Sequence, residues 1–435
     1  MSILSIVICL VGLGILAAFH EVGHFIAARA LGIKVVELSI FVGPKLIGWN
    51  RKGVDYAIRL IPFGAYVRFV GIDEEDGGIS NKDSILNQPR WKRLLVSLAG
   101  PITNFILGAI IFFFMFQAFG FSSMVLASKE EGTQIYQTEA MPGDEILAID
   151  GQRVLSDLDF WQCLGSLNNT DSATLLMKSK DTGEKYEVVL TPEVTDVYML
   201  GVTRTSELDE NGGWVISSVD PEQNDGNPVL EEGDSIISVN GVSVSDPTLS
   251  DVINENGHNT LEVTIIRGGK EMNVQLVGML VHSVNYRGII LLEGSGLWNQ
   301  AKDSVLYSFS VVKVSVETIA DIFQGDIAAT DAVSGPVGIA SVVSDVVDEP
   351  ATNNTQKIST LVFLAGLISV GLAFSNLLPI PGLDGNAMVL VLVEMIRGKK
   401  LSTKTEMIIN AIGFAVLIAL VAFAWTSDIM RLAGG

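Results

Sequence analysis

Two histidines and a glutamate stand within about one helical turn of each other in His20-Glu21-Val22-Gly23-His24. On a helix, side chains four positions apart lie on one face, so both imidazoles can bind the same metal ion. Glu21 then points toward the next coordination position, where it can act as a base. The pattern predicts a zinc site with Glu21 as its catalytic residue.

The apolar run from Ile3 to Ala28 surrounds this motif. It is long enough to cross a hydrocarbon core of roughly 30 Å at about 1.5 Å per residue. Ionisable side chains inside a bilayer cost about 2.5–3.5 kcal/mol each on insertion scales, so a function is their first explanation. The alternative is a chance match on a buried helix of a soluble protein. No basic segment or small-residue cleavage site precedes the motif, so we expect a retained span rather than a signal peptide.

A catalytic zinc ion usually takes three protein ligands and keeps a fourth position open. Asp384 is the candidate for the third ligand, at the end of the segment from Asn376 to Asp384, which contains Pro379 and Pro381. The prolines end a helix at this depth, and broken backbone inside a membrane is tolerated only beside protein or a water-filled cavity. The alternative role for Asp384 is that of a helix N-cap at the interface.

The depth of the two motifs in the membrane can be compared from helix length. From Ile3 to His20 is about 25 Å of helix, and from Leu361 to Asn376 is about 23 Å. If both helices start at the outer surface, both motifs reach the cytoplasmic third of the membrane. The sequence therefore predicts that the two halves of the site meet.

Four apolar stretches are long enough to be spans, which predicts a polytopic α-helical membrane protein. We expect them at Ile3–Ala28, Leu94–Phe121, Ile358–Leu378 and Met407–Trp425. Lysines and arginines gather in residues 29–93 and 397–404, so these loops are cytoplasmic and both termini lie outside. Residues 298–323 carry several charges and favour an amphipathic surface helix over a further span.

The first cytoplasmic loop predicts two strands, Val35–Val42 and Val54–Val70, with a turn at Pro62-Phe63-Gly64. A β-hairpin this apolar, next to a span, is expected to touch the membrane.

The chain has 435 residues, 48% of them hydrophobic, and a net charge of −21. Almost all of the acidic excess lies between Ser122 and Gln300, which makes nucleic acid an improbable partner. Within this part the segment 143–151 recurs as 233–241, and each copy ends in Asp-Gly or Asn-Gly, a tight-hairpin signal. The repeat predicts two small β-rich domains. The two cysteines, Cys9 and Cys163, are not expected to form a disulfide.

These observations divide the chain into five parts. Residues 1–121 form an N-terminal membrane part, and residues 122–198 and 199–296 form the first and second β-rich domains. Residues 297–350 form an amphipathic membrane-surface region, and residues 351–435 form a C-terminal membrane part with the last two spans.

Taken together, the motifs resemble the site-2 protease family of intramembrane metalloproteases, in particular its RseP-like bacterial group. The resemblance rests on five segments in the family's order, which are His20-Glu21-x-x-His24, Ile61-Pro62-x-Gly64-x-Tyr66-Val67, Gly100-Pro101-x-x-Asn104, the two repeats, and Asn376-x-x-Pro379-x-Pro381-x-Leu383-Asp384-Gly385. It covers nearly the whole chain. Ala65, Gly371 and Asn386-Ala387 depart from residues common in the family, and none of them is a proposed ligand.

The resemblance implies a zinc metalloendopeptidase with Zn²⁺ held by His20, His24 and Asp384. It implies that Asn376, Pro379 and Pro381 hold the unwound substrate, and that the β-rich repeats are PDZ-like domains, which could bind peptide C-termini. The implied substrates are single-span membrane proteins, such as anti-sigma factors, or remnant signal peptides. The implied location is the lipid bilayer of a bacterial inner membrane, with the active site near the cytoplasmic side.

Two other function classes were weighed. A catalytically silent membrane scaffold with PDZ-like domains would be marked by loss of Glu21 or Asp384, and both are present. A transporter with a structural metal would spread ionisable residues over several spans, whereas here they cluster on two.

Overall fold

The computed structural model describes residues 2–71, 82–131, 133–165, 172–191, 193–209, 212–285, 288–325, 327–332, 335–348 and 353–433. The chain divides into two compact units. Unit 1 comprises Met1–Ala127, Glu145–Gly165 and Leu291–Arg431, and unit 2 comprises Ser128–Asp144, Ser166–Ile290 and Leu432–Gly435. Each unit is described by itself below.

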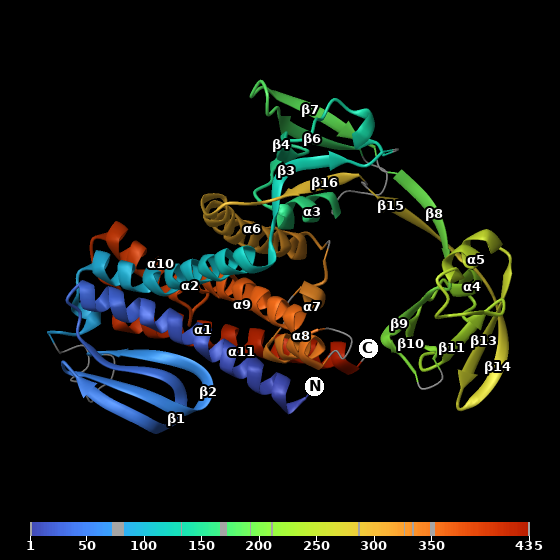
Figure 1. The fold of residues 1–435 in the computed structure, drawn as a ribbon. Coiled ribbons are helices and arrows are strands. Elements are labelled where there is room, and N and C mark those ends of the chain that lie inside the picture. Colours follow the sequence, from blue (N-terminus) through green and yellow to red (C-terminus); the bar gives the residue numbers. More distant parts are fainter. Residues whose placement is uncertain are drawn as a thin grey trace. The chain divides into compact units, whose positions relative to one another are not determined.

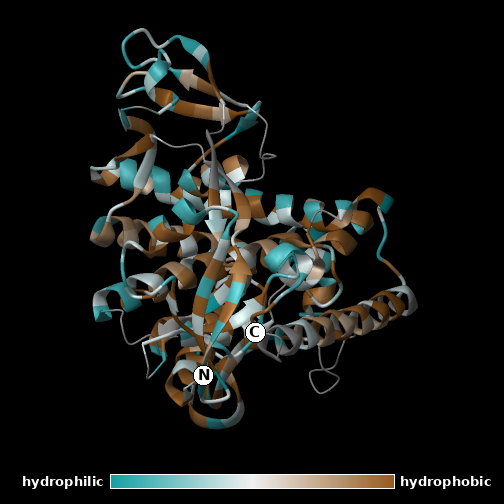
Figure 2. Cartoon of the chain, turned by 90° about the vertical axis from the view of Figure 1, so that its right-hand side faces the viewer, coloured by the Kyte–Doolittle hydropathy of each residue, from teal (hydrophilic) through white to brown (hydrophobic). Residues whose placement is uncertain are grey.

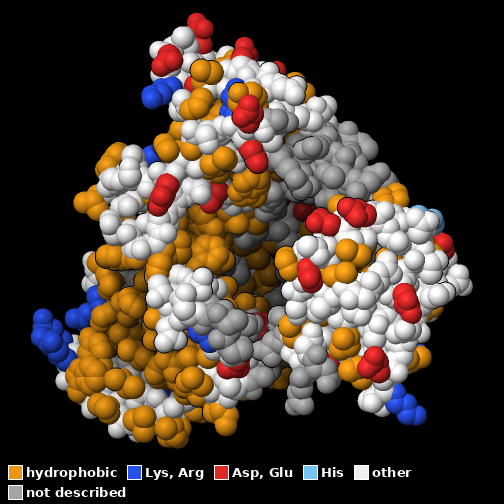
Figure 3. Space-filling view, turned by 45° about the vertical axis from the view of Figure 1, so that its right-hand side comes forward, with side chains coloured by type: hydrophobic (Ala, Val, Ile, Leu, Met, Phe, Trp, Pro, Cys, Tyr) orange, Lys and Arg blue, Asp and Glu red, His pale blue; other side chains and the backbone are white. Residues whose placement is uncertain are grey.

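Four helices of unit 1 are long and apolar enough to cross a membrane, counted over the described residues. They are α1 (Ile3–Ala30), α2 (Arg90–Phe119), α9 (Asn354–Leu377) and α11 (Thr403–Ala433) (Figure 1). Four apolar helices were predicted, and these four confirm the number. Figure 2 shows that hydrophobic residues prevail along the long helices. Large hydrophobic side chains on these helices are exposed as well as buried, as expected for helices in lipid; Phe114 is 63% exposed. Figure 3 shows hydrophobic side chains gathered on the surface.

Helix α2 is the centre of unit 1, because it packs against α1, α9 and two further helices, α6 (Leu297–Gln324) and α10 (Asp384–Arg397). Glycines allow the helices to approach closely. A Cβ on Gly23 of α1 would lie 2.6 Å from the Ala99 carbonyl oxygen of α2. A Cβ on Gly108 of α2 would lie 2.4 Å from a methyl group of Val370 on α9. These contacts fix α1 and α9 on opposite stretches of the same helix.

The remaining helices of unit 1 are shorter or more polar. Helix α6 is not among the four candidate spans of the described residues and carries exposed Trp298 and Phe323, and its predicted place at the membrane surface stays a prediction. Other short helices are α3 (Asp157–Gly165), α7 (Ala329–Ala332), α8 (Pro336–Asp348) and the 3₁₀ turn η3 (Ile85–Asn87). Helix α8 contacts both the start of α1, where Asp348 accepts a hydrogen bond from the Ser2 amide, and the end of α11, through Asp428.

Strands β1 (Val35–Arg51) and β2 (Val54–Phe69) form the sheet that follows α1. Ser39 pairs with both Tyr66 and Ala57, so two segments of β2 lie beside one segment of β1. Each long strand therefore bends back and the pair makes a wider sheet than a simple hairpin (Figure 1).

The strand boundaries in this sheet differ from those predicted. The turn at Pro62-Phe63-Gly64 is confirmed, because Ala57 and Tyr66, on either side of it, both pair with Ser39. Strand β1, however, continues past Val42 to Arg51. Pro62 donates no backbone hydrogen bond and Gly64 has a φ of 70°, which suits residues at which the chain reverses direction within β2.

The described residues of the acidic middle form three sheets. The first has the order β16-β3-β4-β6-β7 with β5 beside β4, the second has the order β14-β13-β11-β10-β9 with β12 beside β11, and β8 and β15 pair as a ribbon. The first sheet contains β3 (Ser122–Lys129), β4 (Glu145–Ile149), β5 (Gln152–Arg153), β6 (Ala173–Lys178), β7 (Lys185–Leu190) and β16 (Ile289–Glu293). The ribbon contains β8 (Glu193–Met199) and β15 (Met279–Asn285), and the short turn η4 (Ile135–Gln137) follows β3.

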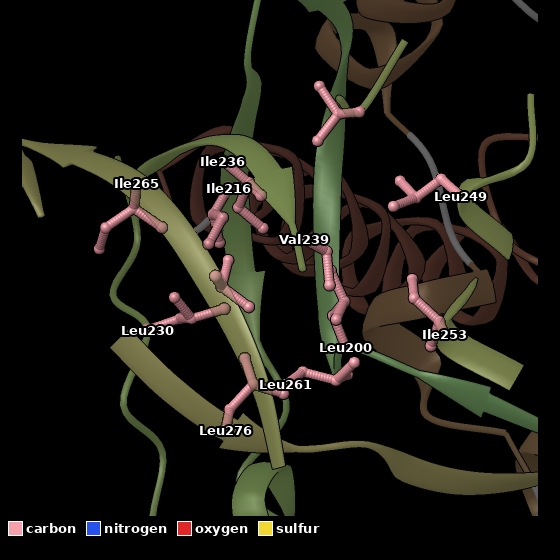
Figure 4. Packing of buried hydrophobic residues seen from close by; sticks show 12 residues of the cluster. Leu200, Ile216, Leu230, Ile236, Val239, Leu249, Ile253, Leu261, Ile265 and Leu276 are labelled. Carbon is pink, nitrogen blue, oxygen red and sulfur yellow. The ribbon is translucent and has the colours of Figure 1, made fainter. Parts of the chain in front are cut away.

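The second sheet lies wholly within unit 2. It contains β9 (Val202–Leu208), β10 (Trp214–Val219), β11 (Ser235–Val239), β12 (Val242–Ser243), β13 (Thr260–Arg267) and β14 (Lys270–Val277), with helices α4 (Gln223–Gly226) and α5 (Leu249–Asn256). Its core joins buried side chains from the strands to Leu249 and Ile253 of α5 (Figure 4).

The two copies of the internal repeat have the same local structure. Hairpins β4–β5 and β11–β12 turn at Asp150-Gly151 and Asn240-Gly241, with φ between 44° and 78° at all four positions. This confirms the predicted tight hairpins. An aspartate opens each copy: Asp144 accepts a hydrogen bond from the Met141 amide. Asp234 likewise accepts a hydrogen bond from the amide three positions before it, that of Glu231.

The predicted boundaries of the two β-rich domains stay a prediction, with one difference in strand assignment. Strand β16 falls within the predicted second domain, 199–296, but belongs to the sheet of the first. The chain leaves the first sheet along β8 and returns antiparallel along β15, so its next strand reaches β3. The second β-rich part is thus inserted before the last strand of the first.

Candidate metal centre

Helix α1 places His20 and His24 on one face, both less than 10% exposed. Their Nε2 atoms are 3.1 Å apart, and their rings meet nearly at right angles, with an interplanar angle of 81°. The helix runs without interruption from Ile3 to Ala30, and Gly23, between the two histidines, faces α2. Two ring nitrogens therefore converge on one point, as the spacing of the motif predicted.

The other ring nitrogen of His24 determines its tautomer. His24 Nδ1 lies 2.7 Å from the Val96 carbonyl oxygen, which only accepts hydrogen bonds. Nδ1 must therefore carry the proton and donate it, which leaves the lone pair on Nε2. This is the orientation that a metal-ligating histidine takes when its second nitrogen is hydrogen-bonded.

Asp384 reaches the same point from the other end of the chain. Its Oδ2 lies 2.9 Å from His20 Nε2 and 3.2 Å from His24 Nε2. Helix α9 ends at Leu377, the backbone is non-helical from Leu378 to Leu383, and α10 starts at Asp384. The alternative N-cap role is taken by Leu383, and Asp384 occupies the first turn of α10.

The three donor atoms fit a zinc ion. In a tetrahedral site with ligands about 2.0–2.1 Å from the metal, neighbouring donors lie roughly 3.3 Å apart. The observed separations of 2.9, 3.1 and 3.2 Å are close to this value. One carboxylate and two imidazoles are a donor set typical of catalytic zinc.

A glycine makes room for the donors. A Cβ on Gly100 of α2 would lie 2.4 Å from His24 Nε2 and 2.6 Å from His20 Nε2. No side chain larger than hydrogen fits there while both imidazoles keep this position. Gly100 belongs to the Gly100-Pro101-x-x-Asn104 motif, to which the sequence assigned no role.

Glu21 lies beside the donors and on the sheet. Its nearest ligand atom and those of His20 and His24 lie within 4.8 Å of one another. Glu21 Oε2 accepts a hydrogen bond of 3.0 Å from the Val67 amide of β2. The strand therefore holds the carboxylate beside the two imidazoles. Val67 belongs to a motif that the sequence analysis singled out, but its role could not be predicted because its contribution is a backbone N–H.

The site opens into a cavity of about 390 Å³. Among the predicted site residues, His20, Glu21, His24, Asn376 and Asp384 line it, whereas Pro379 and Pro381 do not. Pro381 instead lies against Gly413 of α11, and Pro379 is exposed. The buried side-chain amide of Asn104, 1% exposed, also lines the cavity, and among the described residues neither its Oδ1 nor its Nδ2 has a hydrogen-bond partner. Asn104 is thus free to bind water or substrate.

Comparison with known proteins agrees with this site. The model of peptidase family M50 matches residues 8–420. The chain is 26% identical over 436 residues to a protein of Agrobacterium fabrum, covering 97% of this chain and 94% of that protein. It is also 26% identical over 435 residues to a protein of Clostridium acetobutylicum, covering 99% and 98%. Both relatives carry the name "Putative zinc metalloprotease".

Proposed function

The chain belongs to peptidase family M50 and is a zinc metalloprotease of the membrane, and on this premise we propose that it cleaves peptide bonds within the transmembrane segments of other proteins. One observation carries the proposal. Donor atoms of α1 and α10, far apart in the sequence, meet within 3.2 Å beside Glu21. The α1 donors lie in an apolar helix long enough to span a bilayer.

In the mechanism we propose, His20, His24 and Asp384 would hold the zinc ion. Zinc, when bound, lowers the pKa of a water molecule and polarises the scissile carbonyl. Glu21 takes a proton from the attacking water and passes it to the amide nitrogen as the carbon–nitrogen bond breaks. The water oxygen becomes part of the new carboxylate, so the products are two peptides.

Substrate recognition uses the surroundings of the cavity. Asn376 lines it and is placed to hydrogen-bond an unwound substrate backbone, while Pro379 and Pro381 keep the neighbouring loop non-helical. The segment of β2 at Val67 runs beside Glu21, so a substrate strand could add to this edge and place its amide near the base.

The substrates we propose are single-span membrane proteins, such as anti-sigma factors, or remnant signal peptides. Four spans with basic loops at 29–93 and 397–404 support a bacterial inner-membrane protein with both termini outside and the site near the cytoplasmic side. The β-rich parts would then be PDZ-like domains on the outer face.

The test is cleavage of a single-span protein in proteoliposomes. The wild type should yield two fragments with the cut inside the apolar segment, and Glu21→Gln should yield none because the base is lost. Glu271→Gln, which changes an exposed acid on β14, is the control and should cut normally. Cleavage by Glu21→Gln at the wild-type rate would contradict the mechanism, and a cut outside the apolar segment would contradict the substrate class.

A further inference from the structure

A buried carboxylate lies on α10, away from the donors. Glu394 is 1% exposed and lies about 15 Å along the helix from Asp384. Its Oε2 accepts a hydrogen bond of 2.9 Å from Arg93 Nη1 of α2, and Arg90 Nε lies 3.9 Å away. Its Oε1 accepts a hydrogen bond of 3.1 Å from the Leu401 amide. Both carboxylate oxygens are thus engaged, one by α2 and the other by the segment between α10 and α11.

The partners of Glu394 belong to the helix that shapes the metal centre. Arg93 lies one turn before Val96, whose carbonyl orients His24. It lies two turns before Gly100, which makes room for both imidazoles, and residues seven apart share a helix face. The ion pair therefore joins α10 to α2 on the side where α2 contacts the histidines.

A further contact ties the same two segments together. Lys400, just after α10, donates hydrogen bonds from Nζ to the Leu86 carbonyl oxygen (2.7 Å) and to Asn87 Oδ1 (3.0 Å). Leu86 and Asn87 form η3, immediately before α2. The C-terminal end of α10 is therefore fixed to the N-terminal end of α2 at two points.

Asp384 needs such a tie more than the histidines do. His20 and His24 are one turn apart on a single helix that packs closely on α2 at Gly23. Asp384 sits on a separate short helix, and its link to α9 is non-helical backbone from Leu378 to Leu383. The position of its carboxylate relative to the imidazoles depends on how α10 is held.

A buried ion pair is a poor way to gain stability, because desolvation offsets the attraction, and its better-attested use is to fix one arrangement. We propose that Glu394 is a positioning residue, which through Arg93 holds α10 so that Asp384 meets His20 and His24 around zinc. The proposal rests on the ligand set put forward under Proposed function and adds a residue that touches neither metal nor substrate.

The experiment measures zinc release from the purified full-length protein into excess chelator. Glu394→Gln keeps the shape of the side chain and removes its charge, and it should release zinc about 10-fold faster or more, the usual effect of losing a group that orients a ligand. It should also lower kcat with less than a twofold change in KM, because the substrate cavity is untouched.

Asp428→Asn is the matched control. Asp428 is also 1% exposed in unit 1, and it accepts hydrogen bonds from the Gly335 and Gly338 amides at the start of α8, which carries no proposed ligand. Its substitution should lower the melting temperature as a buried carboxylate does, yet release zinc within twofold of the wild type. Equal acceleration by both substitutions would show a general loss of stability and overturn the proposal.

Arg93→Gln approaches the same pair from α2 and serves if Glu394→Gln does not fold. It should accelerate zinc release similarly, and the double variant should be no worse than either single one, because both remove one interaction. Wild-type zinc release in the folded variants would overturn the positioning role.

Zinc release from Asp384→Asn, measured in the same experiment, distinguishes a failure of the proposed ligand set from a failure of the positioning role. If it retains zinc as the wild type does, the ligand set itself fails. If it loses zinc while Glu394→Gln does not, only the positioning role fails.

Discussion

Gly100 shows how a residue without a side chain can be essential to a metal site. Its hydrogen faces both His20 Nε2 and His24 Nε2, and the nearest Cβ distance after substitution would be 2.4 Å. The imidazoles cannot move aside freely, because His24 is held by the Val96 carbonyl and both rings are buried. Packing at this one position therefore determines whether two nitrogens can point at one ion.

Gly100→Ala should lose bound zinc and at least about 10-fold of activity, since the methyl group displaces the donors. Zinc content and cleavage rate of the purified variant are the measurements. Gly12→Ala on α1 is the control, because a Cβ there meets nothing within 4 Å and alanine is a better helix former. Normal zinc content in Gly100→Ala would mean that the donors are arranged differently.

Asp144 and Tyr186 predict a pH dependence in unit 2. The Tyr186 hydroxyl donates to Asp144 Oδ2, and the Lys180 and Met141 amides donate to the same carboxylate. Burial alone would raise the pKa of Asp144, but these hydrogen bonds hold it below the usual value. Burial and the Asp144 charge raise the pKa of Tyr186.

Tyr186→Phe should therefore destabilise this unit by about 1–2 kcal/mol at neutral pH, where Asp144 is ionised. A carboxyl group whose pKa is lower in the folded than in the unfolded protein stabilises the fold at pH values above its unfolded-state pKa. This stabilisation is lost as the pH falls through the folded-state pKa. The difference in free energy of unfolding between Tyr186→Phe and the wild type should therefore shrink below about pH 4. Thermal unfolding of both proteins at several pH values measures it, and a difference that grows in acid would contradict the account.

The candidate site could be predicted from sequence where side chains carry the chemistry. His20, His24 and Asp384 stand in recognisable spacing, and the structure brings them together. Contributions from backbone groups, or from the space that a missing side chain leaves, have no comparable pattern in the sequence. The Val67 amide, the Val96 carbonyl and the space at Gly100 depend on which segments meet in three dimensions.

At the scale of elements, the chain folds as its hydropathy and turn residues indicate. The four apolar helices and both Asx-Gly hairpins follow from local sequence. The course of β1 beyond Val42 and the place of β16 do not, because bulges and long-range strand pairing are decided by tertiary contacts.

The hairpin at Asn240-Gly241 offers a test at this scale. Gly241 has a φ of 77°, so Gly241→Ala should destabilise the second β-rich part by about 1 kcal/mol through backbone strain. Hydrogen exchange of the amides in β11 and β13 should become faster. Ser245→Ala, an exposed position nearby, should leave exchange unchanged. Unchanged exchange in Gly241→Ala would show that the turn is not under constraint.

For the whole molecule, the prediction is an even number of crossings. Cysteines introduced at Lys52 and Lys399 should be protected from an impermeant reagent in intact cells, whereas one at Lys270 should react. All three positions are exposed, so access depends on the side of the membrane alone. The sequence also suggested a probe near Asn211, which lies outside the described residues. The reverse labelling pattern would overturn the placement of every motif.

The β-rich repeats are predicted to act as a size gate on the outer face, with recognition of peptide C-termini as the rival role. Because Met199 pairs with Met279, the ribbon can be closed there by a two-residue turn, which deletes the second repeat and keeps β16. A gate predicts that substrates with intact ectodomains become cleavable. A recognition module predicts slower cleavage of trimmed substrates, and unchanged rates for both kinds of substrate would exclude both roles for the second repeat.

The central claim is that one zinc ion joins α1 to α10 beside a catalytic glutamate. The most direct measurement is the zinc content of three purified proteins, the wild type, Glu21→Gln and Asp384→Asn, together with their cleavage rates. The account predicts one zinc per chain in the wild type and in inactive Glu21→Gln, and loss of both zinc and activity in Asp384→Asn. Full zinc and activity in Asp384→Asn, or loss of zinc from Glu21→Gln, would contradict it.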